Sequence, residues 1–167
     1  MKKAGSDLCE RIDNDFYEVW AGQWWQSESP LYVLVRSVNP ARITYFKRKL
    51  FAECRVRPQG KSVLEVGCGG GQLCEEIARM GFHVTGIDPS ARSLVIAADH
   101  AQAGGLTVNY DQGVGEALSY ADASFDMVFC CDVLEHVRDL SQVVAEIARV
   151  LKPGGGTFVS IQSTAPG

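Results

Sequence analysis

The sequence predicts an α/β fold, a Rossmann-like doubly wound and mostly parallel sheet with helices on both faces. Two observations carry this prediction. Short apolar strands alternate with helical patterns from about residue 61 onward, which is typical of a parallel sheet covered on both sides. The first strand also runs into a glycine-rich turn that leads directly into a helix. The chain has 167 residues, 46% hydrophobic and 22% charged, which are values typical of a globular protein with a substantial core.

The predicted elements follow one another in a regular order. A helical extension over residues 1–57 precedes the sheet-containing core over 58–167. In the extension we expect one helix over 7–25 and a second that runs to about Cys54, with Asn39-Pro40 as its N-cap and first turn. In the core, strands are expected near 61–66, 82–87, 106–110, 125–131 and 156–162, and helices over 72–80, 90–103 and 135–151.

The glycine-rich turn at Gly67, Gly69 and Gly71 indicates a ligand site. Alternate glycines let the backbone turn tightly and approach a ligand, and the helix that follows presents free N–H groups. A dinucleotide site would need a glycine where this chain has Gln72. The carboxylate of Glu65 would repel a pyrophosphate, whereas it suits a ligand that carries ammonium and sulfonium charge. The turn therefore predicts a site for S-adenosylmethionine.

A second acidic residue, Asp88, ends the strand predicted over 82–87. In doubly wound sheets an acid at this place accepts hydrogen bonds from the ribose hydroxyls of a nucleotide-like ligand. The alternative is that Asp88-Pro89-Ser90 only starts the next helix. Both roles can hold at once.

Three ordered motifs make the chain resemble the class I S-adenosylmethionine-dependent methyltransferases. They are the glycine-rich turn, the strand that ends at Asp88, and a third block over 124–161. Within that superfamily, further segments resemble those of the 3-demethylubiquinone 3-O-methyltransferases, also called ubiquinone biosynthesis O-methyltransferases. These segments are Trp24-Trp25, Asn39-Pro40-Ala41-Arg42 and Leu134-Glu135-His136-Val137.

The resemblance implies an S-adenosylmethionine-dependent O-methyltransferase that methylates a catechol or phenol hydroxyl of a polyprenylated quinone precursor. It also implies a seven-stranded sheet whose last strands would follow residue 167, so we expect an incomplete core and a chain that is poorly stable or inactive alone. Two alternatives stay open: a methyltransferase for another small-molecule acceptor, and a non-catalytic cofactor-binding module. The sequence does not predict the oligomeric state.

The resemblance also assigns cofactor contacts to individual residues. The backbone at Gly67 and Gly69 would hold the methionine moiety, with Glu65 orienting the turn and the ammonium group. Gly115 lies in the segment where relatives hold the adenine, and Cys131 has the position that lines the sulfonium.

Arg42 is the residue expected to bind the methionine carboxylate of the cofactor. A guanidinium can pair with a carboxylate through two parallel hydrogen bonds. The sequence alone favours a solvated helix arginine in a basic stretch, whereas the resemblance favours the binding role.

Asp132, Glu135 and His136 follow the fourth strand with the spacing of one helical face. The resemblance implies that such a group holds a magnesium ion that polarises the catechol, although this chain has Asp132 where the family has Glu. Alternatively His136, beside Glu135, is catalytic as a general base, because imidazole exchanges protons near neutral pH. The structural alternative is a capping box with Asp132 as N-cap and Glu135 at N3.

Composition limits the partners and the location. A net charge of −4 argues against a nucleic-acid partner, and six cysteines without metal spacing favour a reducing cytoplasm. No apolar run reaches the roughly 18 residues of a membrane span. The basic and aromatic stretch over 42–57 suggests peripheral contact with the inner face of a membrane. Core packing is the alternative for its apolar residues, Ile43, Phe46, Leu50 and Phe51.

Overall fold

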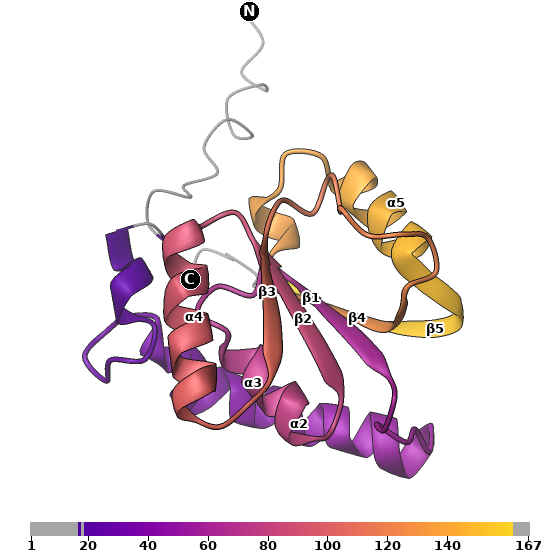
Figure 1. Ribbon diagram of the computed structural model, residues 1–167, viewed down its shortest axis with the longest axis horizontal. Coiled ribbons are helices and arrows are strands. Elements are labelled where there is room, and N and C mark those ends of the chain that lie inside the picture. The colour runs from indigo at the N-terminus through magenta and orange to yellow at the C-terminus, as the bar shows by residue number, and fades with distance from the viewer. Residues whose placement is uncertain (1–16, 18, 162–167) are drawn as a thin grey trace, which may run out of the picture.

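A five-stranded sheet in the order β3-β2-β1-β4-β5 lies at the centre of the computed structural model, which describes residue 17 and residues 19–161 (Figure 1). Every strand pair is parallel. The order changes direction between β1 and β4, and doubly wound sheets bind ligands at the carboxyl ends of the strands beside such a switch point. The predicted Rossmann-like fold is therefore confirmed. Its strands are β1 (Ser62–Val66), β2 (His83–Asp88), β3 (Val108–Gln112), β4 (Phe125–Cys131) and β5 (Leu151–Ser160).

Helices cover both faces of the sheet because alternate strand side chains point to opposite sides. Val63 and Phe129 belong to a core shared with α2 (Asn39–Lys47), α3 (Gln72–Arg79) and α4 (Ala91–Ala103). Leu64 and Val128 belong to a second core, shared with α5 (Leu140–Val150). Figure 1 shows α5 on the opposite side of the sheet from α3 and α4.

The helical extension differs from the prediction at its second helix. Asn39 is not an N-cap, because a π-helix, η2 (Leu34–Val38), leads directly into α2, and a second one, η3 (Arg48–Glu53), follows it. The N–H of Asn39 donates to the carbonyl of Leu34, five residues back. Pro40 has no N–H to donate and its ring crowds the preceding turn, so the helix passes through this point with the wider π spacing.

The apolar residues that suggested a membrane contact pack into the protein. Ile43, Phe46 and Leu50 are buried, and the ring of Phe46 lies edge-on to Phe129 of β4, with centroids 4.8 Å apart. Only the fourth, Phe51, is 36% exposed. Three of the four apolar residues therefore pack in the core, as the alternative to membrane contact predicted. In the described part of the chain, none of the helices has the length and apolarity to cross a membrane.

Helices α3 and α4 lie within one residue of their predicted bounds, whereas two other helices depart from them. Most of the helix expected over 7–25 lies outside the described residues, which include the short η1 (Ala21–Gln23). The helix expected over 135–151 is broken into η4 (Leu134–His136) and α5. The break comes at Asp139, whose side chain accepts a hydrogen bond from the N–H of Gln142 and caps α5.

Candidate active site

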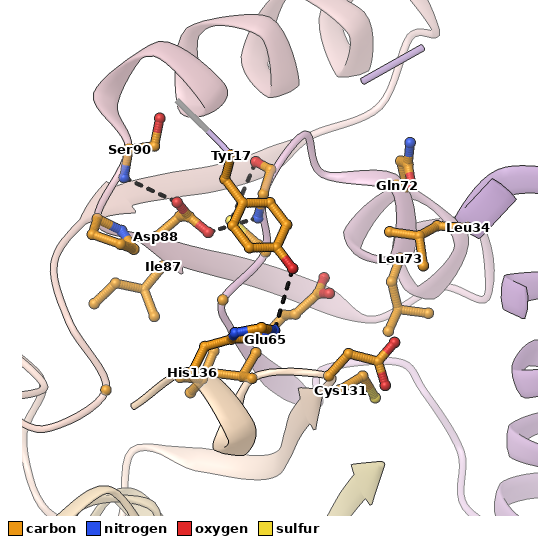
Figure 2. A pocket seen from close by; sticks show the side chains of 18 of the residues that line it. Tyr17, Leu34, Glu65, Gln72, Leu73, Ile87, Asp88, Ser90, Cys131 and His136 are labelled. Atoms are coloured by element: carbon orange, nitrogen blue, oxygen red, sulfur yellow. Dashed lines mark hydrogen bonds between the residues drawn. The ribbon is translucent and has the colours of Figure 1, made fainter. Parts of the chain in front are cut away.

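A cavity of about 760 Å³ lies at the carboxyl ends of β1, β2 and β4, beside the switch point of the sheet (Figure 2). Its volume is in the range of small-molecule and cofactor sites. Glu135 does not line it, although it was predicted together with His136. The predicted site residues that do line it are Arg42, Glu65, Gly67, Gly69, Asp88, Gly115, Cys131, Asp132 and His136.

The glycine-rich turn at the floor of the cavity needs glycine for two reasons. Gly67 and Gly69 have φ of 72° and 49°, in the region that other residues rarely adopt. Neighbouring side chains also leave no room, because a Cβ on Gly67 would lie 2.3 Å from Cγ2 of Val133. The turn is anchored to β2, since the N–H of Gly67 donates to the carbonyl of Ile87 at 2.8 Å.

Asp88 holds the glycine-rich turn and the start of α4 together. Its Oδ2 accepts a hydrogen bond from the N–H of Gly69 at 2.8 Å, and its Oδ1 accepts one from the N–H of Ser90 at 2.9 Å. The N-cap of α4 is Ser90, whose hydroxyl accepts from Ser93. Each carboxylate oxygen can accept a further hydrogen bond, so the ribose contact remains a prediction that this geometry permits.

Glu65 is a buried acid in the wall of the cavity. Its side chain is only 5% exposed, and among the described residues its Oε2 atom has no hydrogen-bond partner. Burial raises the pKa of this carboxyl to about 8. A ligand with positive charge in the cavity would supply the missing partner and favour the ionised form.

Two tryptophans from the N-terminal segment close over the glycine-rich turn. Trp24 packs so tightly on it that a Cβ on Gly70 would lie 2.3 Å from the indole. Its Nε1–H donates to Ser93 of α4 at 2.9 Å, and Gln72 donates to its carbonyl at 2.6 Å. The Nε1–H of Trp25 donates to the carbonyl of Gly70 at 3.0 Å. The tryptophan pair was predicted only as a point of resemblance, with no role in the site. Gln72, which stands where a dinucleotide site has a glycine, could have indicated that a further segment packs on the turn.

Arg42 reaches the cavity from α2 and forms a short ion pair with Asp132. Both side chains are largely buried, with 15% and 13% of their surface exposed. Arg42 is therefore not a solvated helix arginine. Asp132 follows β4 with a φ of 57°, and its Oδ1 accepts a hydrogen bond from the hydroxyl of Ser160.

The group of Asp132, Glu135 and His136 is not arranged as predicted. Asp132 lies before η4 in a left-handed conformation, so the three residues do not share a helical face, and the N-cap of η4 is Val133, which rules out the capping box. Within the described residues no group of three or more His, Cys, Asp or Glu side chains is placed to hold a metal ion. The predicted magnesium site therefore has no support in this arrangement, in which the Asp132 carboxylate pairs with Arg42.

Gly115 and Cys131 contribute uncharged parts of the cavity wall. A Cβ on Gly115 would lie 3.1 Å from Val66 and 3.3 Å from Val143, so the backbone here lies directly against the core. Burial raises the pKa of the Cys131 thiol to about 11, and the thiol therefore stays neutral at neutral pH.

A parallel sheet of this order, with a glycine-rich turn after β1 and an acid at the end of β2, is the doubly wound arrangement that class I S-adenosylmethionine-dependent methyltransferases share with dinucleotide-binding proteins. Residues 64–159 match the family described as methyltransferase domain, and the chain belongs to this family.

Named relatives agree with this class. The ubiquinone biosynthesis O-methyltransferase of Rhizobium leguminosarum bv. trifolii is 38% identical, and the match covers 96% of this chain and 66% of that protein. The enzyme of the same name from Pectobacterium atrosepticum is 43% identical over 86% of this chain and 58% of its own length. A solved S-adenosylmethionine-dependent methyltransferase from Methanosarcina mazei has a TM-score of 0.59 and 30% identity, covering 62% of this chain and 53% of that one. The chain thus spans less than two thirds of the length of its curated relatives.

Proposed function

We propose that this protein is an S-adenosylmethionine-dependent O-methyltransferase whose acceptor is a catechol or phenol hydroxyl of a polyprenylated quinone precursor. The observation that carries the proposal is one cavity that joins a glycine-rich turn, the buried Glu65 carboxylate and the His136 imidazole. The name shared by relatives that are 38% and 43% identical supports this choice of acceptor.

The residues present fit the cofactor. Glu65 offers a buried carboxyl oxygen without a hydrogen-bond partner among the described residues, and the ionised carboxyl would suit an ammonium or sulfonium group. Gly67 and Gly69 bring backbone to the cavity at points where a Cβ would collide with Val133 or Trp24. Arg42, already oriented by Asp132, has further N–H donors for a carboxylate.

The reaction needs alignment and removal of one proton. Bound S-adenosylmethionine supplies an electrophilic methyl group on a positively charged sulfur, which leaves as a neutral thioether. His136 lines the same cavity and accepts the proton of the acceptor hydroxyl as the methyl–oxygen bond forms. The glycine-rich turn and the tryptophan pair keep the donor in one orientation, which contributes to the rate by proximity. Magnesium has no part in this proposal.

Apolar residues of the N-terminal segment suit the hydrophobic tail of such an acceptor. The cavity wall on this side comes from the loop before η2 and from η2 itself. Its apolar members are Pro30, Leu31, Val33 and Leu34. Val33 is 53% exposed, so this wall lies at the mouth of the cavity, where a polyprenyl chain could extend outward.

Methyl transfer from S-adenosylmethionine to a catechol tests the proposal. We expect His136→Ala to lower kcat by about 10²–10⁴-fold, because a positioned general base contributes that much. Binding of S-adenosylhomocysteine, measured by calorimetry, should persist in this variant. His83→Ala, an exposed histidine of β2 outside the cavity, is the matched control and should keep full activity.

The same assay separates the alternatives. Cofactor binding without methyl transfer to any acceptor by the unchanged protein would favour the non-catalytic cofactor-binding module. Transfer to an amine or carboxylate in preference to a catechol would favour a methyltransferase for another small molecule.

A further inference from the structure

The phenol ring of Tyr17 lies inside the cavity, against the proposed base. Its Oη is 3.3 Å from Nε2 of His136, and its ring is edge-on to the imidazole, with centroids 5.6 Å apart. The same ring lies nearly parallel to the indole of Trp24, at 9° and 6.2 Å between centroids. Figure 2 shows the Tyr17 hydroxyl directed at His136 above Glu65.

The hydroxyl of Tyr17 keeps its proton in this place. Burial raises its pKa, and the negative charges of Glu135, Asp132 and Asp88 raise it further. It can therefore donate to Nε2 of His136. A phenolic acceptor must make the same contact, since its hydroxyl has to lie within hydrogen-bond reach of the base.

We propose that Tyr17 occupies the subsite of the acceptor ring: a phenol or catechol binds with its ring beside Trp24 and its hydroxyl on Nε2 of His136, and it displaces the Tyr17 side chain. This inference rests on the proposed function. Beyond that function, it specifies where the acceptor ring binds and identifies Tyr17 as the side chain that competes with the acceptor.

Three features favour displacement over a permanent role for Tyr17. One lone pair on Nε2 serves one hydroxyl, so Tyr17 and an acceptor exclude each other. The contact of 3.3 Å is longer than a strong O–H hydrogen bond, so its loss costs little. Trp24 is held by Ser93 and Gln72, so the aromatic wall remains when Tyr17 leaves.

The first test compares catechol methylation by the unchanged protein and Tyr17→Phe. We expect KM for catechol to fall about twofold to threefold, the effect of one weak competing hydrogen bond, with kcat unchanged. Tyr120→Phe is the matched control, because its hydroxyl donates to Asp111 at 2.9 Å outside the cavity, and it should change neither constant. An unchanged KM, or a lower kcat, in Tyr17→Phe overturns the inference, the second by showing that Tyr17 positions His136.

A second measurement follows the Tyr17 side chain directly and keeps its hydroxyl. The protein carries 3-fluorotyrosine at position 17 and is saturated with S-adenosylhomocysteine, and catechol is then titrated while the fluorine NMR signal is recorded. We expect the signal to move to the position of a solvent-exposed tyrosine as catechol binds. An unmoved signal, where the separate assay with S-adenosylmethionine shows methyl transfer to catechol, overturns this inference alone. Absence of catechol binding here and of methyl transfer in that assay overturns the proposed acceptor as well.

Discussion

The proposed cofactor can be tested most directly at Glu65. Its carboxyl has a pKa of about 8 because it is buried, so in the free protein it is protonated at pH 7. A raised carboxyl pKa means that the folded state binds the proton more tightly than the unfolded state. Its contribution to stability is therefore greatest at low pH and declines as pH rises from the unfolded value of about 4.5 to about 8.

The prediction at this position concerns proton release. Binding of S-adenosylhomocysteine, whose ammonium group favours ionised Glu65, should release a proton at pH 7, and its affinity should rise between pH 6 and pH 8 by up to about tenfold per unit. Calorimetry in two buffers of different ionisation enthalpy measures the released proton. Glu65→Gln should abolish the release and weaken binding at pH 8.

Glu53→Gln serves as the control for this prediction. Glu53 is exposed in η3 and paired with Lys49, far from the cavity lining, so its replacement should leave the pH dependence intact. Affinity that does not change with pH in the unchanged protein would contradict the assignment of Glu65 to the ammonium group.

Site residues whose role depends on the local backbone could be predicted from the sequence. Gly67 and Gly69 are recognisable because a tight turn after a strand requires them. The pairing of Arg42 with Asp132 joins residues 90 positions apart, and that of Tyr17 with His136 joins residues 119 apart. Neither contact follows from spacing, because it depends on how the N-terminal segment packs over the sheet.

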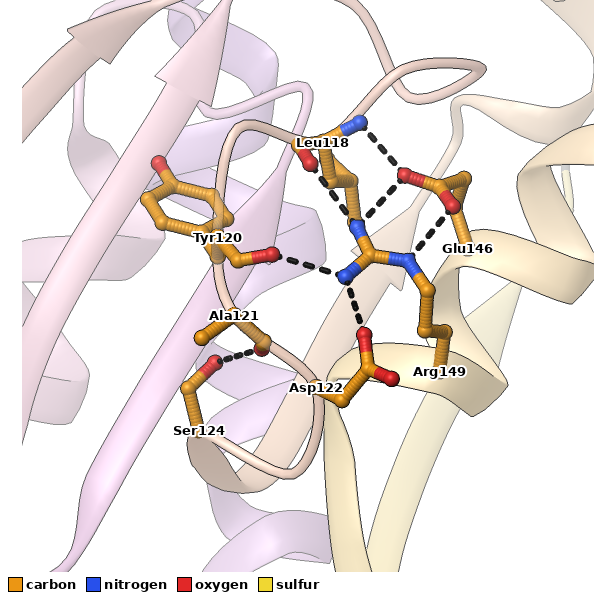
Figure 3. Close-up of polar contacts among 7 residues, drawn as sticks. All are labelled: Leu118, Tyr120, Ala121, Asp122, Ser124, Glu146 and Arg149. Atoms are coloured by element: carbon orange, nitrogen blue, oxygen red, sulfur yellow. Dashed lines mark hydrogen bonds and ion pairs between the residues drawn. The ribbon is translucent and has the colours of Figure 1, made fainter.

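Helix α5 anchors the loop over residues 118–124, which lies just after a segment that lines the cavity. Arg149 binds Glu146 on its own helix and donates to the carbonyls of Leu118 and Tyr120 and to Asp122 (Figure 3). The loop over 118–124 comes just after residues 113–116, which line the cavity. One guanidinium thus fixes the far end of the segment on which Gly115 lies.

Replacing this guanidinium should loosen the loop without unfolding the sheet. In Arg149→Leu we expect amide hydrogen exchange over 116–124 to become about tenfold faster, because the loop carbonyls lose their donors, while β1 and β4 keep their protection. Arg48→Leu, which removes an exposed arginine paired with Glu53, is the control and should change neither region. Equal exchange in both variants would show that the loop is held by its backbone alone.

The accuracy of the predicted bounds varied among both strands and helices. Helices α3 and α4 lie within one residue of their predicted bounds, whereas β3 begins two residues later and β5 five residues earlier than predicted. A buried parallel strand is a short apolar run bounded by turns, and β1 and β4 lie within one residue of their predicted bounds. Helix boundaries depend on capping. Asp139 could have been recognised as a cap, whereas Asn39-Pro40 has the pattern of an N-cap and first turn although the helix passes through it.

At the scale of the whole molecule, aromatic rings join the N-terminal helices to the sheet. Phe46 of α2, Phe129 of β4 and Phe158 of β5 pack within 5 Å of one another, measured between ring centroids. The alternation of strands and helices predicted the sheet and its two layers. It could not predict that α2 belongs to one of those layers, since an amphipathic helix does not specify the surface it covers.

Phe129→Ala tests how far stability depends on this contact. Phe129 is fully buried, so we expect the free energy of unfolding to fall by about 3–5 kcal/mol, a large part of the total for a domain of this size. Urea denaturation followed by circular dichroism measures the change. Phe51→Ala, at a ring that is 36% exposed, should cost less than half as much. A loss of less than 1 kcal/mol for Phe129→Ala would place the main core elsewhere.

The tryptophan pair has a practical consequence for work on this protein. The chain contains three tryptophans, and two of them, Trp24 and Trp25, contact the backbone of the glycine-rich turn. Trp25 also stacks on the imidazole of His100, at 3.5 Å between ring centroids. Indole emission responds to the polarity and charge around the ring, so intrinsic fluorescence should report occupancy of the cavity directly. The protein therefore carries its own optical reporter of ligand binding, and an affinity can be titrated without a label.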